Sequence, residues 1–594
     1  MSYRRKKLLA LFFAMALSMT AVAGCTGIKS STGNVVSSET ETNAEETSAQ
    51  SEAGTFSSAD MFTERDLAGT YEESGAVYVT LSDDGIAGET DGVVIDGQMV
   101  TITAEGTYIF SGTLSEGQIV VDADNAKVQI VFDNVDITCA SSAAVYVKSA
   151  EKVFVTLAEG SQNTLRNTDE YVAIDDNNID AVIFAKSDLT LNGTGSLTII
   201  SAEGHGIVSK DDLKIIGGTY DITAAGHALS GKDSVRIADG TFILTAEKDG
   251  IHAENADDEE KGYIYIADGD FTITSDGDGM DASNIVQIED GTLDITAGGG
   301  SANSLKTHES DVPGGPGGGM PQNGEKLDGE SMPQMGEKPD GENMPQDTTT
   351  DESGTSTKGI KAGGGMYLNG GTYQIDSADD SIHSNANITI ADGTYTLATS
   401  DDGVHADDAL IVNGGTITVT ESYEGLEGLA VTINDGTIDI TASDDGINTA
   451  GEKMELNGGY IHILAGGDGV DSNGDLTING GEIYIDGPSD NGNSAIDYGD
   501  RSSAYVNGGT LVAIGSSGMA EVMSDSSKQK VLMVKLGEQM EAGNVVLTDS
   551  EGNVIVSYTA LKTYDCVIIS TAEVESGATY TLTTSGTMTE VTAE

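Results

Sequence analysis

The chain has 594 residues and is strongly acidic, with 97 Asp and Glu residues against 28 Lys and Arg residues and a formal net charge of −69 at pH 7. This charge repels a phosphate backbone, which argues against nucleic-acid binding. Trp is absent and aromatic residues make up only 5% of the chain, so the flat indole platform that often holds neutral sugar chains is missing, although 20 Tyr residues are available for stacking.

The N-terminus has the form of an export signal. Four basic residues, Arg4 to Lys7, precede the apolar run from Leu8 to Leu17. Residues 22–25 then resemble a bacterial lipobox with Cys25 as the acylated residue, and the alternative is a secretory signal cut by ordinary signal peptidase. We therefore predict a lipoprotein signal peptide over residues 1–24. The exported chain would be anchored through Cys25 to the outer face of the cytoplasmic membrane, at the cell surface.

Two regions of different composition follow the predicted signal peptide. Residues 25–70 are rich in Ser, Thr and Glu, which predicts a flexible tether. Residues 71–518 contain short segments that alternate apolar and polar residues, such as 219–223 and 416–420, and no sustained helical periodicity. The more apolar strands predicted between Val77 and Ile200 are typical of the capping end of a repeat array.

An aliphatic residue that follows an acidic and a small residue recurs through this body, and we call it the marker. A glycine series runs in phase with it, from Gly371 to Gly481. Two series with one period of about 22 residues indicate a solenoid. Three strands and three turns fit one period, which predicts an all-β, right-handed parallel β-helix rather than the left-handed hexapeptide type. The markers are Ile207, Leu229, Ile251, Met280, Leu305, Ile360, Ile382, Val404, Leu426, Ile447, Val470 and Ile496.

Two segments depart from the repeat. Residues 309–356 are rich in Pro, Gly, Met and Glu, which predicts a disordered insert. From Met519 onward the marker is lost, so residues 519–594 are predicted to form a small separate β module or cap. Cys139 and Cys566 lie near opposite ends of the array, and we expect buried thiols rather than a disulfide.

Equivalent side chains of successive coils should form columns, because the marker points inward and its neighbours do not. Both columns described next are expected to face solvent. Two residues before the marker lies an acidic column, doubled by Asp379, Asp401 and Asp444: Asp249, Asp278, Asn303, Asp380, Asp402, Glu424, Asp445 and Asp468. One residue after the marker lies a second column: His252, Asp281, Lys306, Lys361, His383, His405, Glu427, Asn448, Asp471 and Asp497.

These columns suggest a metal site. Asp-Gly is common in tight turns, so any single Asp could serve its turn alone. Carboxylates stacked about 4.8 Å apart repel one another unless cations screen them, and calcium takes six to eight such oxygen ligands. A rival zinc site at His383 and His405 is disfavoured by the carboxylates around it. The predicted calcium ligands are Asp379, Asp380, Asp401, Asp402, Asp407, Glu424, Glu427, Asp444 and Asp445.

Five ordered motifs carry a family resemblance: residues 357–362, 379–384, 401–406, 422–427 and 444–448. Together they resemble the bacterial carbohydrate-binding β-helix domain of clostridial surface proteins that bind cellulose and polygalacturonate. That family is similar to polysaccharide lyase family nine, the calcium-dependent pectate lyases. The resemblance covers roughly residues 77–565. It implies a right-handed β-helix, bound calcium and a plant cell-wall polysaccharide as ligand.

The net charge of the protein bears on which polysaccharide it binds. An acidic protein repels an anionic polysaccharide, but calcium reverses this by bridging protein carboxylates to uronate carboxylates. We therefore predict a monomeric surface lipoprotein that binds pectin or polygalacturonate, with cellulose as a further candidate, through Ca²⁺ and through Lys361, His383, His405 and Glu427.

Two other functions stay open. The first is a pectate lyase acting by β-elimination, with Lys361 or Lys306 as the base, although acidic surroundings raise a lysine's pKa and weaken it as a base at neutral pH. The second is a structural adhesin of the envelope without a dedicated sugar ligand.

Overall fold

The computed structural model describes residues 55–88, 90–304, 356–451, 453–499 and 501–593. The chain is nearly all-β, with 53% strand and 2% helix. In these described ranges no helix is long and apolar enough to cross a lipid bilayer. The predicted signal peptide with Cys25, Leu305, Lys306 and all but the last residue of the predicted insert lie outside the described residues.

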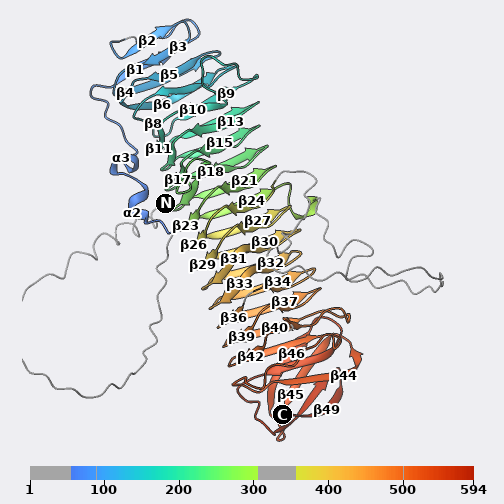
Figure 1. The fold of residues 1–594 in the computed structure, drawn as a ribbon. Helices are drawn as coiled ribbons and strands as arrows, with labels where there is room; N and C mark the ends of the chain where they lie inside the picture. The colour runs from blue at the N-terminus through green and yellow to red at the C-terminus, as the bar shows by residue number, and fades with distance from the viewer. Residues whose placement is uncertain (1–54, 89, 305–355, 452, 500, 594) are drawn as a thin grey trace, which may run out of the picture. The chain divides into compact units, whose positions relative to one another are not determined.

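Parallel pairing dominates the fold, and most strands pair with the strand three places further along the chain (Figure 1). Three consecutive strands therefore make one repeat, and the repeats form three ladders that we call A, B and C. Strands β31 and β33 are long enough to contribute to both A and B.

The ladders have the following members. Ladder A contains β5 (Gln118–Asp122), β7 (Val145–Ser149), β10 (Ala181–Ala185), β13 (His205–Ser209), β16 (Leu229–Gly231), β19 (Ile251–Ala253), β22 (Met280–Ala282), β25 (Ile360–Ala362), β28 (Ile382–Ser384), β31 (Val404–Val412), β33 (Leu426–Ile433), β35 (Ile447–Thr449), β38 (Val470–Ser472) and β41 (Ile496–Tyr498). Ladder B contains, besides β31 and β33, β6 (Lys127–Thr138), β8 (Lys152–Leu157), β11 (Asp188–Gly193), β14 (Asp212–Ile215), β17 (Ser234–Ile237), β20 (Tyr263–Ile266), β23 (Val286–Ile288), β26 (Met366–Leu368), β29 (Ile388–Ile390), β36 (Met454–Leu456), β39 (Leu476–Ile478) and β42 (Ala504–Val506). Ladder C contains β9 (Gln162–Asn167), β12 (Ser196–Ser201), β15 (Thr219–Ala224), β18 (Thr241–Ala246), β21 (Asp270–Ser275), β24 (Thr292–Ala297), β27 (Thr372–Ser377), β30 (Thr394–Thr399), β32 (Thr416–Glu421), β34 (Thr437–Ala442), β37 (Tyr460–Ala465), β40 (Glu482–Asp486) and β43 (Thr510–Gly515).

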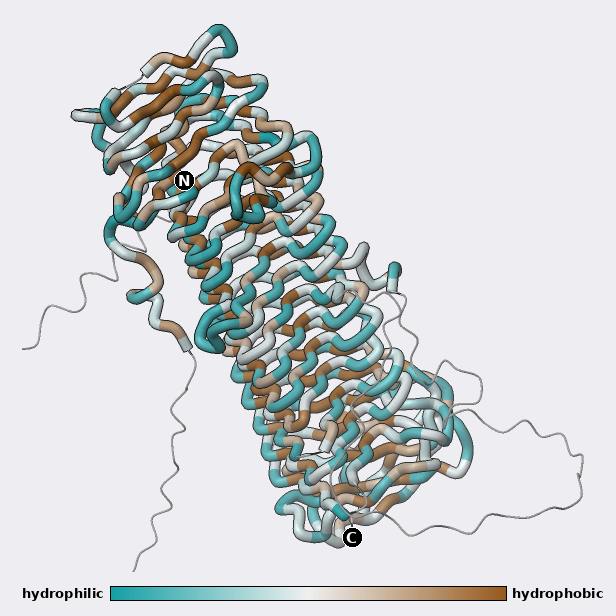
Figure 2. The backbone as a smooth tube through the Cα atoms, turned by 45° about the horizontal axis from the view of Figure 1, so that its top comes forward, coloured by the Kyte–Doolittle hydropathy of each residue, from teal (hydrophilic) through white to brown (hydrophobic). Residues whose placement is uncertain are grey.

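The core lies between the three ladders. Alternate residues of β15, β18 and β21 are buried, as the sequence pattern predicts for strands with one buried face. Their inward aromatic rings stack from repeat to repeat, with centroids 5.3 Å apart for Tyr220 and Phe242 and 4.6 Å apart for Phe242 and Phe271. Every marker in the described ranges is at most 1% exposed, which confirms that the marker points inward. Figure 2 shows the resulting recurrence of hydrophobic positions along the stacked strands.

The turn that leads into ladder C explains the glycine series. The glycines at 371, 393, 415, 436, 459 and 481 have φ between 84° and 123°, which side chains rarely tolerate. Asn side chains in the same turns bond to one another between repeats, at 2.8 Å for Asn413 and Asn434 and 2.9 Å for Asn434 and Asn457. These two features keep successive repeats in register.

The predicted coil at Leu305 is wrong. Met280 pairs directly with Ile360, and β22 already has β19 on its other side, so ladder A has no place for a strand between them. The N–H of Lys358 donates to Asp278 Oδ1 at 2.7 Å across 80 residues of chain. Asn303, which was predicted for the acidic column, lies in the short 3₁₀ helix η1 (Ser301–Asn303) instead.

The last part of the predicted tether is ordered, which corrects the prediction for residues 55–70. These residues include α2 (Ser58–Met61) and α3 (Glu64–Leu67). Asp66 is fully buried, lies 2.6 Å from Lys152 Nζ and accepts a hydrogen bond from Thr190 Oγ1 at 2.9 Å. This buried ion pair ties α3 to ladder B.

The two ends of the array differ. At the first end are β1 (Val77–Leu81), β4 (Gly106–Leu114) and the antiparallel hairpin of β2 (Val93–Asp96) and β3 (Met99–Ile102). At the other end β47 (Tyr564–Ser570) pairs antiparallel with β43 and with β44 (Leu532–Met540). A four-stranded antiparallel sheet follows, made of β45 (Gly543–Thr548), β46 (Val554–Ala560), β48 (Thr579–Thr584) and β49 (Thr587–Thr592).

The C-terminal residues form a cap on ladder C. Val512 and Ile514 of β43 share one hydrophobic cluster with Leu547 and Leu582 of the four-stranded sheet. The expectation of buried thiols is confirmed, because Cys139 and Cys566 are both free and buried. Burial raises the pKa of each thiol to about 11, so neither is activated.

Candidate functional site

Two columns of side chains, polar at every position except Val208, run along ladder A. The turn column holds the residues two positions before each marker: His205, His227, Asp249, Asp278, Lys358, Asp380, Asp402, Glu424, Asp445, Asp468 and Ser494. The strand column holds the residues one position after it: Val208, Ser230, His252, Asp281, Lys361, His383, His405, Glu427, Asn448, Asp471 and Asp497. The pairing of ladder A confirms the register, since it aligns every one of these strand-column residues with the next.

The turn column has a structural role. In seven repeats one acceptor atom of the side chain receives the backbone N–H of the equivalent residue in the next repeat: His205, His227, Asp249, Asp278, Asp380, Asp445 and Asp468. Asp380 and Asp402 are only 2% and 6% exposed, so the prediction that the acidic column faces solvent is wrong for them. The N–H to Oδ1 distances run from 2.6 to 3.2 Å in the pairs Asp278 to Asp249, Asp402 to Asp380 and Asp468 to Asp445.

Lys358 interrupts this pattern because an ammonium group cannot accept a hydrogen bond. Asp379 Oδ1 accepts the N–H of Asp380 in its place, at 2.8 Å. The Nζ of Lys358 lies 2.8 Å from Asp379 Oδ1 and 2.6 Å from Asp380 Oδ2. The predicted ligands Asp379, Asp380 and Asp401 do come together, but the first two already share this ammonium group. Lys358 stands two residues before the marker Ile360, so the sequence alone could have placed it in the turn column.

The second carboxylate oxygen of a turn-column Asp faces the strand column three residues later. In three repeats that residue is a histidine, which places an imidazole against the carboxylate within the protein. The distances from Nδ1 to Oδ2 are 3.0 Å for His252 and Asp249, 2.8 Å for His383 and Asp380, and 2.9 Å for His405 and Asp402.

His405 is the most strongly held of these cations. Its Nδ1 is also 3.0 Å from Glu427 Oε2, and its Nε2 is 3.4 Å from Asp407 Oδ1. Burial by itself lowers the pKa of His405, but hydrogen bonds to Asp402 and Asp407 and the nearby carboxylate charges raise it to about 12. A doubly protonated ring has no lone pair for a metal. This disfavours the zinc site considered at His383 and His405.

From Glu424 onward the internal cations disappear. Carboxylate oxygens of Asp445, Asp468 and Asp471 lie within 4.8 Å of one another, and we call these three residues with Asn448 the carboxylate site. Burial, and then the repulsion of neighbouring carboxylates, raises the pKa of Asp445 to about 8, of Asp468 to about 7 and of Asp471 to about 6. In the described part of the chain no Lys, Arg or His forms an ion pair with these three residues.

Asn448 supplies an independent sign of a missing partner. Its Nδ2 donates to Glu424 Oε2 at 2.9 Å, but among the described residues its buried Oδ1 has no hydrogen-bond donor. Buried acceptors are rarely left unsatisfied. A hard cation would satisfy both this oxygen and the crowded carboxylates, so the residues present fit such an ion.

The predicted metal ligands of this region divide into two groups. Asp445 belongs to the carboxylate site, and Asp444 contributes charge beside it. Glu424 and Glu427 lie one repeat earlier, where burial and neighbouring acids raise the pKa of Glu427 to about 8 and that of Glu424 well above its usual value. Asp468 and Asp471 were placed in the columns by the sequence but not chosen as ligands.

Lys361 does not lie with the predicted metal ligands. Its Nζ is 3.4 Å from Asp278 Oδ2 and 3.3 Å from Asp281 Oδ1. Burial opposes its charge, but the two carboxylates outweigh burial and raise the pKa of Lys361 above its ordinary value. An ammonium group held in this way is a poor base at neutral pH.

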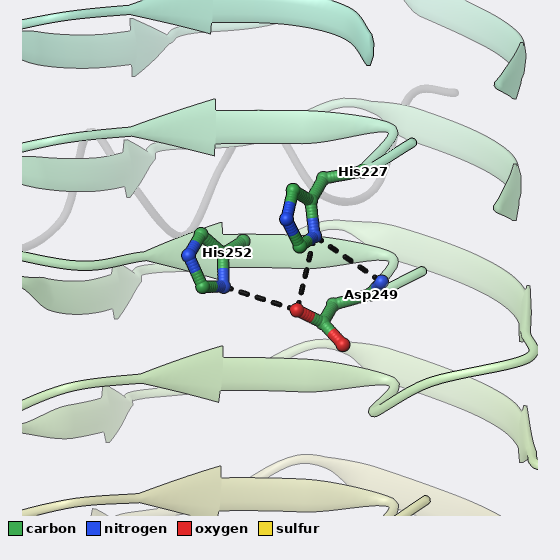
Figure 3. Close-up of side chains that lie close together, drawn as sticks. All are labelled: His227, Asp249 and His252. Atoms are coloured by element: carbon green, nitrogen blue, oxygen red, sulfur yellow. Dashed lines mark hydrogen bonds and ion pairs between the residues drawn. The ribbon is translucent and has the colours of Figure 1, made fainter. Parts of the chain in front are cut away.

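The opposite end of the columns contains a histidine site, formed by His205, His227, Asp249 and His252. The Nδ1 atoms of His227 and His252 each lie 3.0 Å from Asp249 Oδ2 (Figure 3). The rings of His227 and His252 stack with centroids 4.1 Å apart and planes 11° apart. The lone pair of His227 Nδ1 already accepts the backbone N–H of Asp249 at 3.2 Å, so it is not available to an ion. Burial opposes a charge on His252, but Asp249 and Asp281 raise its pKa to about 9, which indicates an ion pair rather than a metal centre.

His205 and His227 were missed by the sequence reasoning, although both stand two residues before a marker. The N–H of His227 donates to His205 Nδ1 at 2.8 Å, and that of Asp249 donates to His227 Nδ1 at 3.2 Å. These imidazoles therefore take the structural role that carboxylates have in later repeats. Burial lowers the pKa of His205 to about 3, so its ring is neutral.

Comparison with known proteins agrees with a sugar-binding class. The chain belongs to the family described as carbohydrate-binding domain-containing protein, whose model matches residues 96–403 and 400–578. A carbohydrate-binding domain-containing protein of Acetivibrio thermocellus is 40% identical over 139 residues, which are 23% of this chain and 49% of that relative. The chain thus spans about half the length of this curated relative.

A solved structure is also similar to part of the chain. It is described as a polysaccharide lyase-like protein from C. thermocellum, in a gadolinium derivative. The sequence identity is 36%, the match covers 38% of this chain and 92% of that one, and the TM-score is 0.37.

Proposed function

We propose that this protein is a surface lipoprotein, anchored through Cys25, that binds acidic plant cell-wall polysaccharide through calcium. Pectin or polygalacturonate is the favoured ligand and cellulose the second choice. We further infer that the repeats wind as a right-handed parallel β-helix of about 22 residues per coil, which agrees with the 22-residue offset between bonded equivalents such as His205 and His227. Family membership and the parallel register support this proposal.

The carboxylate site carries the calcium part of the proposal. One buried and two half-buried carboxylates with raised pKa values, and an unsatisfied amide oxygen, offer only oxygen ligands, which calcium prefers. Calcium bound there would retain open coordination positions toward solvent, because one oxygen each of Asp445 and Asp468 is already engaged by a backbone N–H. A uronate carboxylate could fill such a position and reverse the repulsion between an acidic protein and an acidic sugar.

Two measurements on the full-length protein test this function. Metal analysis after dialysis, with and without chelator, should find calcium that chelator removes. Pull-down on insoluble polysaccharides should show retention on polygalacturonate in calcium, a sharp decrease in chelator, and weaker retention on cellulose. Retention on polygalacturonate that is unchanged by chelator, or the absence of bound calcium, would contradict the proposal.

A lyase activity is the alternative that the same experiment separates. It requires a base, and the expected base Lys361 is charged and held by Asp278 and Asp281. Incubation with polygalacturonate and calcium at neutral pH should therefore produce no rise in the ultraviolet absorbance of unsaturated uronate. A steady rise that Lys361→Gln abolishes would establish the enzyme instead.

A further inference from the structure

Basic side chains gather on the face of the histidine site, in a chain whose acids outnumber its bases 97 to 28. A pocket of about 370 Å³ is lined there by Lys210, Lys232 and Lys248 together with His205, His227 and His252. We call this the basic pocket. It lies at the opposite end of the two columns from the carboxylate site.

The lysines are arranged by the ladder. Lys148, Lys186, Lys210 and Lys232 each directly follow the same ladder A position, because Val147 aligns with Ala185, Ser209 and Gly231. Four successive repeats therefore place a lysine at one position, with a spacing of about 4.8 Å between neighbouring strands. Such a row is costly through mutual repulsion unless anions lie against it.

The charges of the protein only partly balance this row. Lys148 pairs with Asp122 and Lys232 pairs with Asp257, each at 2.8 Å. Over the described ranges neither Lys210 nor Lys248 forms an ion pair, and both are exposed. Lys210 does lie over the ring of Phe184, 5.4 Å from its centroid.

The acidic groups at the pocket have partners of their own. Asp257 is taken by Lys232, and Asp249 lies between His227 and His252. Glu254 is 3.5 Å from His252 Nε2. Since His205 Nδ1 accepts a backbone N–H, the proton of its neutral ring is on Nε2, which makes this ring a further donor at the pocket.

We propose that the basic pocket binds carboxylate groups of an acidic polysaccharide directly, without calcium, through Lys210 and Lys248. This inference rests on the proposed function for the identity of the sugar. It adds a second, metal-independent contact, at the opposite end of the columns from the proposed calcium. A polymer with one carboxylate on each sugar matches a row of cations that repeats from strand to strand.

The test uses full-length protein and fluorescently labelled tetragalacturonate, followed by anisotropy in excess chelator at low salt. The wild type should bind, and added salt should weaken the binding. Lys210→Gln/Lys248→Gln should bind about tenfold more weakly, because two charged donors are lost. The control Lys127→Gln/Lys528→Gln removes the same charge from exposed sites elsewhere and should bind like the wild type.

Two further probes identify the ligand class. Fully methyl-esterified tetragalacturonate should not bind, since it has no charged carboxylate. Dextran sulfate of matched charge should bind more weakly than tetragalacturonate; equal binding would overturn the assignment to uronates. No binding of tetragalacturonate in chelator, or equal loss in both double variants, would overturn the basic pocket itself. Calcium-dependent retention on polygalacturonate in the same preparations reports separately on the proposed function.

Discussion

At the N-terminal end of the two columns Asp249 lies between His227 and His252, whereas at the C-terminal end Asp445 lies with Asp468 and Asp471. Both groups occupy the same two positions relative to a buried marker, and both accept backbone N–H groups of the next repeat. The first group contains its own cation, His252, and the second contains none. One backbone arrangement therefore supports either an internal ion pair or a cation site, and the choice depends on the strand-column side chain.

The largest expected effect comes from removing an internal cation. His405→Gln leaves buried Asp402 and half-buried Glu427 without their counter-charge, and breaking a buried pair costs about 3–5 kcal/mol. Chemical unfolding in chelator should show this loss in the free energy of unfolding. Calcium should recover part of it, since the variant resembles the carboxylate site.

The control for this change is His462→Gln, which removes a histidine paired with the exposed carboxylate of Asp439 at 2.8 Å. Its longer contact of 3.8 Å is with buried Asp486, which keeps hydrogen bonds from the Tyr558 hydroxyl and the Leu561 N–H. It should cost about 1 kcal/mol or less. If both variants lose the same stability, the contrast between internal neutralisation and cation capture does not hold.

The carboxylate site is tested by Asp468→Asn/Asp471→Asn. Each Asn keeps an acceptor oxygen, so the bond from Ser494 N–H to residue 468 can persist while the charge is lost. Calcium-dependent binding of polygalacturonate should weaken about a hundredfold, because two charged ligands are removed. The exposed pair Asp221→Asn/Asp294→Asn makes the same charge change on ladder C and should bind normally. Normal binding by both variants would show that the cation binds at another site.

The carboxylate site and the histidine site should also differ in the protons that they bind. The pKa values of Asp445, Asp468 and Asp471 are raised above their unfolded values, so between about pH 4 and pH 8 these three groups hold more protons in the folded state than in the unfolded state. In chelator, their contribution to stability should therefore fall as pH rises through this window, by an amount on the order of 2 kcal/mol. Calcium displaces these protons and should remove the fall.

Thermal unfolding at pH 5 and pH 8, with chelator and with calcium, measures this difference. Asp445→Asn should flatten the profile in chelator. The lowered pKa of Asp249 places its titration below this window, but His205 and His252 of the histidine site do differ in protonation between the folded and unfolded states there, so the comparison with Asp445→Asn isolates the carboxylate contribution. A profile in chelator that Asp445→Asn leaves unchanged would show that the carboxylates are already compensated.

The smallest effect is expected from Lys361→Gln. Lys361 is occupied by Asp278 and Asp281, at a distance along ladder A from the carboxylate site. Calcium-dependent binding of polygalacturonate should change less than about twofold. A tenfold loss would place Lys361 in direct contact with the sugar, as the sequence first suggested.

Much of the fold was predictable because it is repetitive and local. Period-two alternation in segments such as 219–223, together with the glycines that require positive φ, set the strands, the turns and the period. The marker had to be buried, so the register of the strand column followed directly, including the alignment of His383 with His405. The coil at Leu305 was mispredicted because a marker-like pattern does not show whether ladder A has room for it.

The chemistry of the columns was only half predictable. By itself the sequence determined which residues share a column, since equal spacing in a regular stack makes equal positions coincide. Only the tertiary structure decided how each residue is used. It turned Asp380 inward to accept the backbone N–H of Asp402, and it placed Lys358 across Asp379 and Asp380. Burial and contacts between repeats set these charges, and neither quantity can be read from spacing along one chain.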